Sequence, residues 1–338
     1  MSQDSPKPDD SADLIPSDPQ TNNATEQHSQ AAIDWSDFHH WLECFCVVTF
    51  DLEIGQALEF VYPPECCLSD KERTNICYLS FPDSNAGLLG DVQYYFRFRR
   101  SARLTPLTLS PAQIYYNTHT APALAADARY LYGFVYFRQV KDKTVPRGYL
   151  QKSVVLISPL PMISLFAHVT QVVALEYFES GQVSIEGACH NMRRWGRPDP
   201  GEILQLPLHG QIVQMRIPSR HDRPLSPSKE MLSQAMAKQA TCFPSPILIP
   251  SVQEMNLYSW LLPVLPHLQL LWELVLTCEP IVVMAPSPDL CSEFVRCLLS
   301  LIWPLKFCSE YRPFFTIHDS EFKEFTTKTQ APPAVILG

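Results

Sequence analysis

The 23 residues from 153 to 175 carry no formal charge, and their apolar pattern changes partway along. Before Pro159 the β-branched run VVLI is typical of a buried strand. From Ile163 onward apolar residues recur at helical spacing along one side, and Gly181 is placed to end the helix. Pro159 and Pro161 interrupt the hydrogen bonds that a membrane-spanning helix needs. The pattern predicts a strand followed by an amphipathic helix, not a transmembrane segment.

A second apolar region, residues 260–286, is broken by Pro263 and Pro266 and carries two glutamates. We expect this region to belong to a water-soluble core as well. No transmembrane segment is therefore predicted in the chain.

Strand-like patterns dominate the first half of the chain, with a turn near Gly55 and strict alternation after Gln93. They predict five or so antiparallel strands that are packed by the helix after Pro161, in one module over residues 34–218. The expected strands lie in residues 43–50, 53–64, 74–84, 93–101 and the paired stretch 131–158.

Residues 219–246 are polar and punctuated by Pro and Ser, which is typical of a linker or loop. Residues 247–338 alternate helix and strand patterns, which predicts a partly parallel sheet. The expected elements are a helix around 268–280, a buried strand over 280–286, a helix over 289–303, and strands over 313–319 and 334–338. Because no covering helix follows the final strand, we expect a truncated module. The predicted fold class is α/β, with an α+β module before an incomplete α/β one.

The acidic residues of the chain are most concentrated at its N-terminus. Residues 1–33 contain six acids against Lys7 and have no apolar centre, which predicts a disordered acidic tail rather than a signal peptide. The rest of the chain is only mildly acidic, which argues against a nucleic-acid partner. The basic clusters at 97–100 and 192–197 are expected to be solvated faces rather than phosphate-binding patches.

The 11 cysteines show no spacing that is typical of a metal site. Cys44 and Cys46 should share one face of a strand and be buried as free thiols. Adjacent Cys66 and Cys67 cannot form a CxxC pair. No metal or cofactor is predicted; a zinc site that uses His39, His40 and nearby cysteines is the alternative.

Catalytic signatures are missing from the sequence. It contains no GxxxxGK[ST], no GxGxxG after a strand and no GxSxG. His318, Asp319 and Ser320 are neighbours and cannot converge as a triad. We predict no catalytic residue and expect surfaces to carry the function, with an unrecognised hydrolase as a weaker alternative.

Two stretches resemble DENN-domain proteins. Residues 147–166 resemble the hallmark of the upstream module, and residues 271–288 resemble the start of the central module. Cys278 departs from the family, which usually has glycine there, so a left-handed helix cap becomes doubtful. The resemblance covers about residues 41–338 and is carried by Gln151, Ser153, Ser158, Pro161, Phe166, Leu271, Trp272, Glu273, Glu279, Ala285, Pro286 and Pro288.

The resemblance implies a longin-like lobe over 34–218 and the start of a central lobe over 247–338. It also implies a guanine nucleotide exchange factor for a Rab GTPase in endosomal traffic, cytoplasmic and peripherally bound to endosomes, recycling endosomes among them. Such a factor favours the nucleotide-free GTPase and needs no nucleophile. The alternative is a truncated, exchange-inactive binding module that keeps only partner contacts.

A two-lobe clamp should touch its GTPase through polar segments at strand ends, and residues 317–325 are the best candidate. There the predicted strand is buried by Phe314, Phe315 and Ile317, and the side chains that follow should point outward. The alternative is that Asp319 or Ser320 only caps a helix. The candidate contacts are His318, Asp319, Glu321 and Lys323.

Overall fold

The computed structural model describes residues 33–82, 90–101, 107–143, 148–217, 219–221, 246–249, 255–326 and 333–338. The predicted acidic tail, apart from its last residue, and nearly all of the predicted linker lie outside these ranges. Contacts divide the chain into residues 1–34 and 35–338, and the second unit contains every element described below. It combines helices with antiparallel and parallel sheets, so the α/β class is confirmed at that level.

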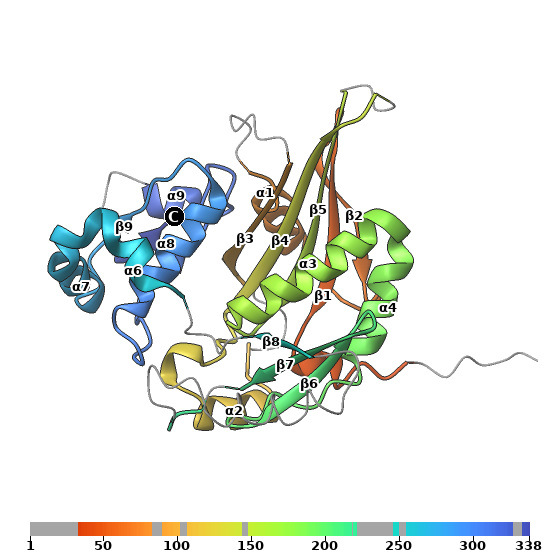
Figure 1. Ribbon diagram of the computed structural model, residues 1–338. Coiled ribbons are helices and arrows are strands. Elements are labelled where there is room, and N and C mark those ends of the chain that lie inside the picture. Colours follow the sequence, from red (N-terminus) through yellow and green to blue (C-terminus); the bar gives the residue numbers. More distant parts are fainter. Residues whose placement is uncertain are drawn as a thin grey trace, which may run out of the picture. The chain divides into compact units, whose positions relative to one another are not determined.

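Five antiparallel strands form the main sheet, in the order β2-β1-β5-β4-β3 (Figure 1). The hairpin predicted near Gly55 is confirmed, and this glycine has a φ of +80°. Side chains alternate between two buried faces, so Val47 contributes to one core and Val48 to the other. The strands are β1 Cys44–Asp51, β2 Gly55–Tyr62, β3 Gly90–Arg99, β4 Tyr130–Lys141 and β5 Tyr149–Ser158.

One face of this sheet is covered by α3 Ile163–Ser180, which is followed by α4 Gln182–Met192. The predicted strand and amphipathic helix around Pro161 are confirmed. Phe166, Val169 and Val173 are buried against the sheet, and α3 ends at Gly181, where φ is +76°.

The other face is covered by α1 Asp70–Leu79, which lies behind the sheet in Figure 1. The strand predicted over residues 74–84 is therefore wrong. A capping box between Ser69 and Glu72 starts a helix just before that stretch. Ile76 and Leu79, three residues apart, are then buried together against the sheet.

A second sheet has three strands. β6 Ile203–Leu208 and β7 Gln211–Arg216 form a hairpin, whose two turn residues, His209 and Gly210, both have positive φ. β8 Ile247–Ile249 pairs with β7 in parallel. The start of the segment predicted as the central module thus takes part in a sheet with upstream residues. Three short helices, η1 Phe38–His40, α2 Pro111–His119 and η2 Pro122–Leu124, also belong to the first part of the chain.

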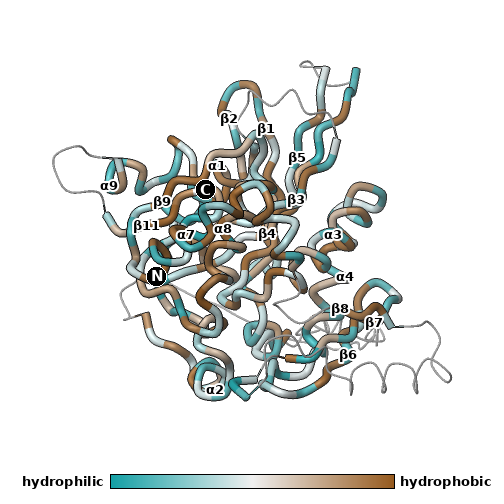
Figure 2. Tube along the Cα trace, turned by 60° about the vertical axis from the view of Figure 1, so that its left-hand side comes forward, coloured by the Kyte–Doolittle hydropathy of each residue, from teal (hydrophilic) through white to brown (hydrophobic). Residues whose placement is uncertain are grey.

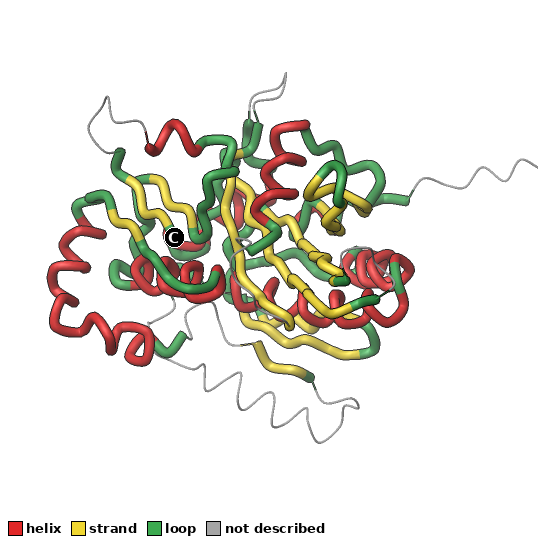
Figure 3. Tube along the Cα trace, turned by 90° about the horizontal axis from the view of Figure 1, so that it is seen from above, coloured by secondary structure: helices red, strands yellow, loops and turns green. Residues whose placement is uncertain are grey.

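A third, parallel sheet has the order β10-β11-β9 (Figure 3). The predicted parallel pairing is confirmed. The strand predicted over residues 313–319 is wrong, because the strand is β10 Glu310–Arg312 and ends before Pro313, which has no amide to donate. The elements of this part are α6 Leu257–Leu261, η3 Leu262–His267, α7 Leu268–Leu276, β9 Ile281–Val282, α8 Pro288–Ser300, α9 Phe322–Thr326 and β11 Val335–Leu337.

The apolar arm, defined as residues 257–284, lies largely at the surface (Figure 2). Trp272 is 43% exposed, Val282 68% and Met284 91%. The expectation that residues 260–286 lie in a core holds for Val275, which is fully buried, but it is wrong for most of this region. The prolines do break the helix into the η3 turn. By length and composition alone Leu257–Leu276 could cross a membrane, and only 11% of it is buried.

Candidate functional site

The candidate segment, residues 317–325, follows β10 and packs against α1. The amide of Ser320 donates to the Asn75 side-chain oxygen over 3.2 Å. The His318 ring stacks on Tyr78 with 5.0 Å between ring centroids. Residues about 240 positions apart in sequence therefore hold the segment in place.

Arg312, at the end of β10, is fully buried and anchors the same region. It donates to the Glu310 carboxylate over 2.7 Å, to the Arg97 carbonyl over 3.0 Å, and to the Glu321 carboxylate. A buried guanidinium is tolerated only when it is paired in this way. Burial opposes ionisation of Glu310, but Arg312 and Arg99 outweigh it and lower the pKa of this carboxyl.

Arg99 and Lys71 complete what we call the Arg312 network. Arg99 lies 2.6 Å from Glu310 and 3.3 Å from both Glu321 and Glu324. Lys71, on α1, lies 3.4 Å from Glu321. The network comprises Lys71, Arg99, Glu310, Arg312, Glu321 and Glu324.

Two of the four predicted contact residues do not point outward. Glu321 is 5% exposed, because three cations surround it, and Asp319 is 4% exposed. Oδ1 of Asp319 accepts the Glu321 amide over 2.8 Å, which forms an Asx turn directly before α9. Its Oδ2 is buried without a hydrogen-bond partner among the described residues, and burial raises the pKa of the carboxyl.

The exposed side of the segment is formed by other residues. His318 and Lys323 are exposed as predicted, and Ile317, expected to be buried, is 66% exposed. The arrangement thus presents an imidazole, an ammonium group and an aliphatic side chain on a support fixed by buried charges. Among the described residues, no cluster of three or more His, Cys, Asp or Glu side chains could hold a metal ion.

Arg97 was predicted to be solvated with its basic neighbours, and this is wrong. It is 4% exposed, and its guanidinium carbon lies 3.5 Å from the Tyr130 ring centroid and 4.1 Å from that of Tyr311. Its Nη1 donates to the Tyr311 carbonyl over 3.1 Å. Arg97 and Arg99 share one face of β3, and this alternation among aromatic residues was the signal that could have revealed them.

The cysteine predictions have mixed outcomes. Cys44 and Cys46 are buried with their sulfur atoms 3.7 Å apart, as predicted for one strand face. A hydrogen bond with Cys46, a further one with Cys66 and burial raise the pKa of the Cys44 thiol.

Cys278 keeps the left-handed cap that its departure from glycine had put in doubt. Its φ is +57°, and the next amide, of Glu279, donates to the Leu274 carbonyl over 2.9 Å.

Comparison with known proteins gives a consistent set of relatives. A family model described as transport protein Avl9 matches residues 42–189. Protein DENND6A of Gallus gallus is 51% identical over 319 residues, 94% of this chain and 53% of the relative. Protein DENND6B of Homo sapiens is 50% identical over 309 residues, 91% of this chain and 52% of the relative. The DENND6 homolog of Dictyostelium discoideum is 33% identical over 314 residues. The chain spans about half the length of the first two of these curated relatives and 41% of the third.

Proposed function

The chain is a homologue of the DENND6 proteins, and from this premise we propose that it contributes guanine nucleotide exchange activity toward a Rab GTPase. The proposal rests on sequence identity of about 50% to DENND6A and DENND6B over more than nine-tenths of the chain. The matched residues include the part with the main sheet and the later part with the parallel sheet. An exchange factor binds the nucleotide-free GTPase more tightly than the nucleotide-bound form, and this difference expels GDP. Such a non-covalent activity agrees with a sequence without catalytic motifs.

The proposed GTPase contacts are the exposed residues of the candidate segment. His318, Lys323 and the neighbouring Ile317 would meet the GTPase. Asp319 and Glu321 would act behind them, because their buried carboxylates fix the backbone that carries the exposed side chains. A preorganised surface loses less entropy on binding than a flexible one.

We place this activity at the cytoplasmic surface of endosomes, including recycling endosomes, with the chain attached peripherally. The family match to a transport protein supports a role in membrane traffic. The partner class is a Rab-family GTPase, with no nucleic acid and no bound cofactor.

A second candidate function is an exchange-inactive binding module. The exposed apolar arm favours it, because exposed apolar surface suits contact with another protein. In this case the longin-like lobe would keep partner contacts without turnover.

GDP release from a panel of Rab proteins separates the two functions. The chain would be compared with full-length Gallus gallus DENND6A in the same assay. Faster release with both proteins supports exchange activity of this chain. Faster release with DENND6A alone, together with measurable binding of this chain to the same Rab, supports the binding module. No binding and no release by this chain would refute both.

The proposed contacts can be tested by binding to the nucleotide-free Rab that the panel identifies. His318→Ala combined with Lys323→Glu should weaken binding about tenfold or more, since rim charges and their neighbours tune association. Lys141→Glu, at an exposed end of β4, is the matched control and should leave affinity unchanged. Unchanged affinity in the double variant, with intact folding, would place the contact surface elsewhere.

A further inference from the structure

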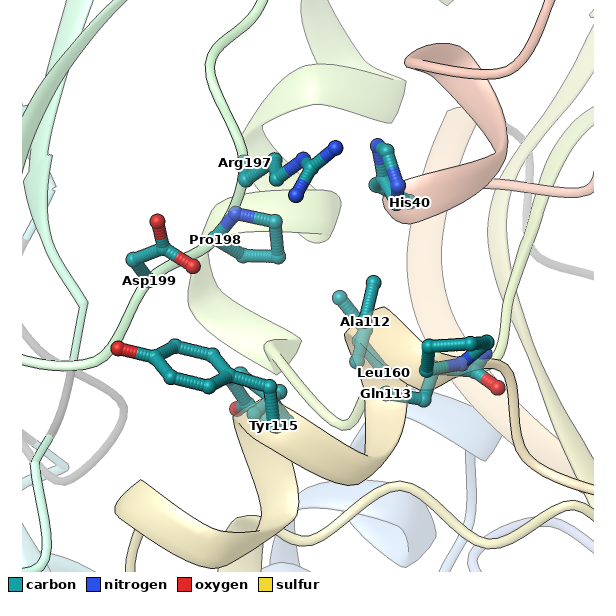
Figure 4. Close-up of a pocket in the computed structure, with 10 residues that line it drawn as sticks. His40, Ala112, Gln113, Tyr115, Leu160, Arg197, Pro198 and Asp199 are labelled. Atoms are coloured by element: carbon teal, nitrogen blue, oxygen red, sulfur yellow. The ribbon is translucent and has the colours of Figure 1, made fainter.

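A cavity of about 240 Å³ lies between α2 and the loop that follows α4 (Figure 4). Its apolar lining comes from both sides. Ala112 and Tyr115 contribute from α2, Leu160 from the turn before α3, and Pro198 from the opposite loop. These walls are apolar, and Leu160 and Tyr116 join the cavity to the first hydrophobic core.

One end of the cavity is cationic. Figure 4 shows the guanidinium of Arg197 and the imidazole of His40 pointing toward each other, with Asp199 and Tyr115 at the other end. Arg197 is exposed, lines the cavity and forms no ion pair among the described residues. The Nδ1 atom of His40 lies 3.6 Å from the Asp37 carboxylate, beyond a normal hydrogen bond. Because Arg197 has no ion-pair partner among the described residues and Asp199 lies at the other end, the Arg197 side of the cavity complements an anionic group.

The walls are held in place before any ligand arrives. A capping box between Ser110 and Gln113 fixes the first turn of α2. The indole of Trp41 donates to the Gly196 carbonyl over 2.8 Å, directly before Arg197. The indole of Trp195 donates to the Pro207 carbonyl over 2.9 Å. The loop that carries Arg197 is therefore anchored by two buried indoles, so the cavity is preformed.

We propose that this cavity binds a segment of a partner protein that places an apolar side chain on Ala112 and Leu160 and a neighbouring carboxylate on Arg197. The volume is below the roughly 300–1,000 Å³ of typical small-molecule sites, but it suffices for one side chain. Arginine suits a carboxylate because its planar fork can donate two hydrogen bonds. Tyr115 at 52% exposure and Ile114 at 54% offer further apolar surface for the rest of the segment. The site is separate from the proposed exchange surface and does not depend on it.

The test uses the full chain labelled at alanine and leucine methyl groups, with N-acetylphenylalanine as the probe. NMR titration should shift the Ala112 and Leu160 methyl signals. The neutral analogue N-acetylphenylalaninamide should bind about fivefold more weakly, because it lacks the charge that meets Arg197. Absence of shifts at both methyl groups, or equal affinity for acid and amide, would overturn the proposal.

Two variants and one matched control assign the contacts. Arg197→Gln should reduce affinity for the acid to that for the amide, whereas Arg194→Gln, on the same loop but outside the cavity lining, should change neither. Ala112→Leu should fill the cavity and block both ligands while the α2 helix is kept, since leucine is a good helix former. Retention of full binding by either Arg197→Gln or Ala112→Leu would refute the assigned geometry.

Peptides decide whether the natural ligand is a protein. Blocked hexapeptides with a central Phe, flanked on either side by Asp or Glu, are compared with N-acetylphenylalanine. At least one should bind about tenfold more tightly, because it also covers Tyr115 and Ile114. If no peptide exceeds the small acid, the site takes a free carboxylic acid and the proposed protein partner is wrong.

Discussion

Arg312 and Glu321 form an ion pair in which the Arg312 side chain is fully buried and the Glu321 side chain is 4% exposed. The pair joins the end of β10 to the turn before α9. It therefore sets the position of the segment that presents His318 and Lys323.

Arg312→Met should lower the free energy of unfolding by about 3–5 kcal/mol, because Glu321 would stay buried with less compensating charge. Urea unfolding, followed by circular dichroism, measures the change. The double variant Arg312→Met with Glu321→Met should recover at least half of the loss, since both charges are then removed. A loss below about 1 kcal/mol for Arg312→Met alone would show that the pair is unimportant.

Asp319→Asn should stabilise the protein at neutral pH. Burial raises the pKa of the Asp319 carboxyl, so its charged form destabilises the fold when the pH is above the folded pKa. This cost disappears below the unfolded pKa of about 3.9, where the group is protonated in both states. The asparagine variant should gain about 1 kcal/mol at pH 7 and almost nothing at about pH 3.5. Urea unfolding at several pH values measures this, and an equal gain at both ends would contradict it.

Cys278→Gly should raise the free energy of unfolding by about 0.5–1 kcal/mol. Cys278 has a φ of +57°, where a Cβ atom is strained and glycine is not. The matched control is Thr277→Gly, at a φ of −87°, which should instead destabilise by about the same amount. Thermal unfolding of both variants gives the comparison. A loss of stability in Cys278→Gly would mean that packing of the thiol outweighs the backbone strain.

Gly133→Ala should destabilise the sheet by about 2 kcal/mol. Gly133 lies opposite Phe96, and an added Cβ would lie 2.2 Å from the buried Phe96 ring. In a Phe96→Leu background the same substitution should cost less than half as much, because the shorter side chain leaves room. Equal costs in the two backgrounds, measured by urea unfolding, would show that the ring is not the obstacle.

The apolar arm should bind a hydrophobic dye such as anilinonaphthalene sulfonate under native conditions. Leu270 is 52% exposed and Trp272 43%. Replacing both by Gln should lower the dye fluorescence while changing the free energy of unfolding by less than about 1 kcal/mol, since surface substitutions have small effects. Exposed Leu175→Gln on α3 serves as the control and should leave the signal unchanged. No dye binding by the parent chain would refute the exposed arm.

The sequence predicted correctly those helices and turns that are marked by a proline or glycine at their own ends. The proline break before Ile163, the stop at Gly181 and the turn at Gly55 are of this kind. The helix α1 was mistaken for a strand because its start signal, Ser69 with Glu72, precedes an apolar run that also suits a strand.

The candidate site was predicted less well for a different physical reason. Asp319 and Glu321 lie in a polar stretch, so local sequence suggested exposure. The burial of Glu321 depends on partners distant in sequence, such as Lys71, which lies 250 positions away, and Arg99. Ion pairs between residues so far apart produce no recognisable pattern in the local sequence. The exposure of His318 and Lys323 could be predicted from the polar local sequence alone.

The Arg312 network also joins parts of the chain that are synthesised at different times. Lys71 and Glu321 meet across 250 positions, so this contact closes one of the longest loops in the chain. Closing such a loop costs chain entropy, and topologies rich in such contacts fold slowly. On the ribosome the strands up to β5 emerge well before residues 310–326. Until then Arg97 and Arg99 lack Tyr311 and Glu310, and folding is completed only when the later-made segment docks on β3.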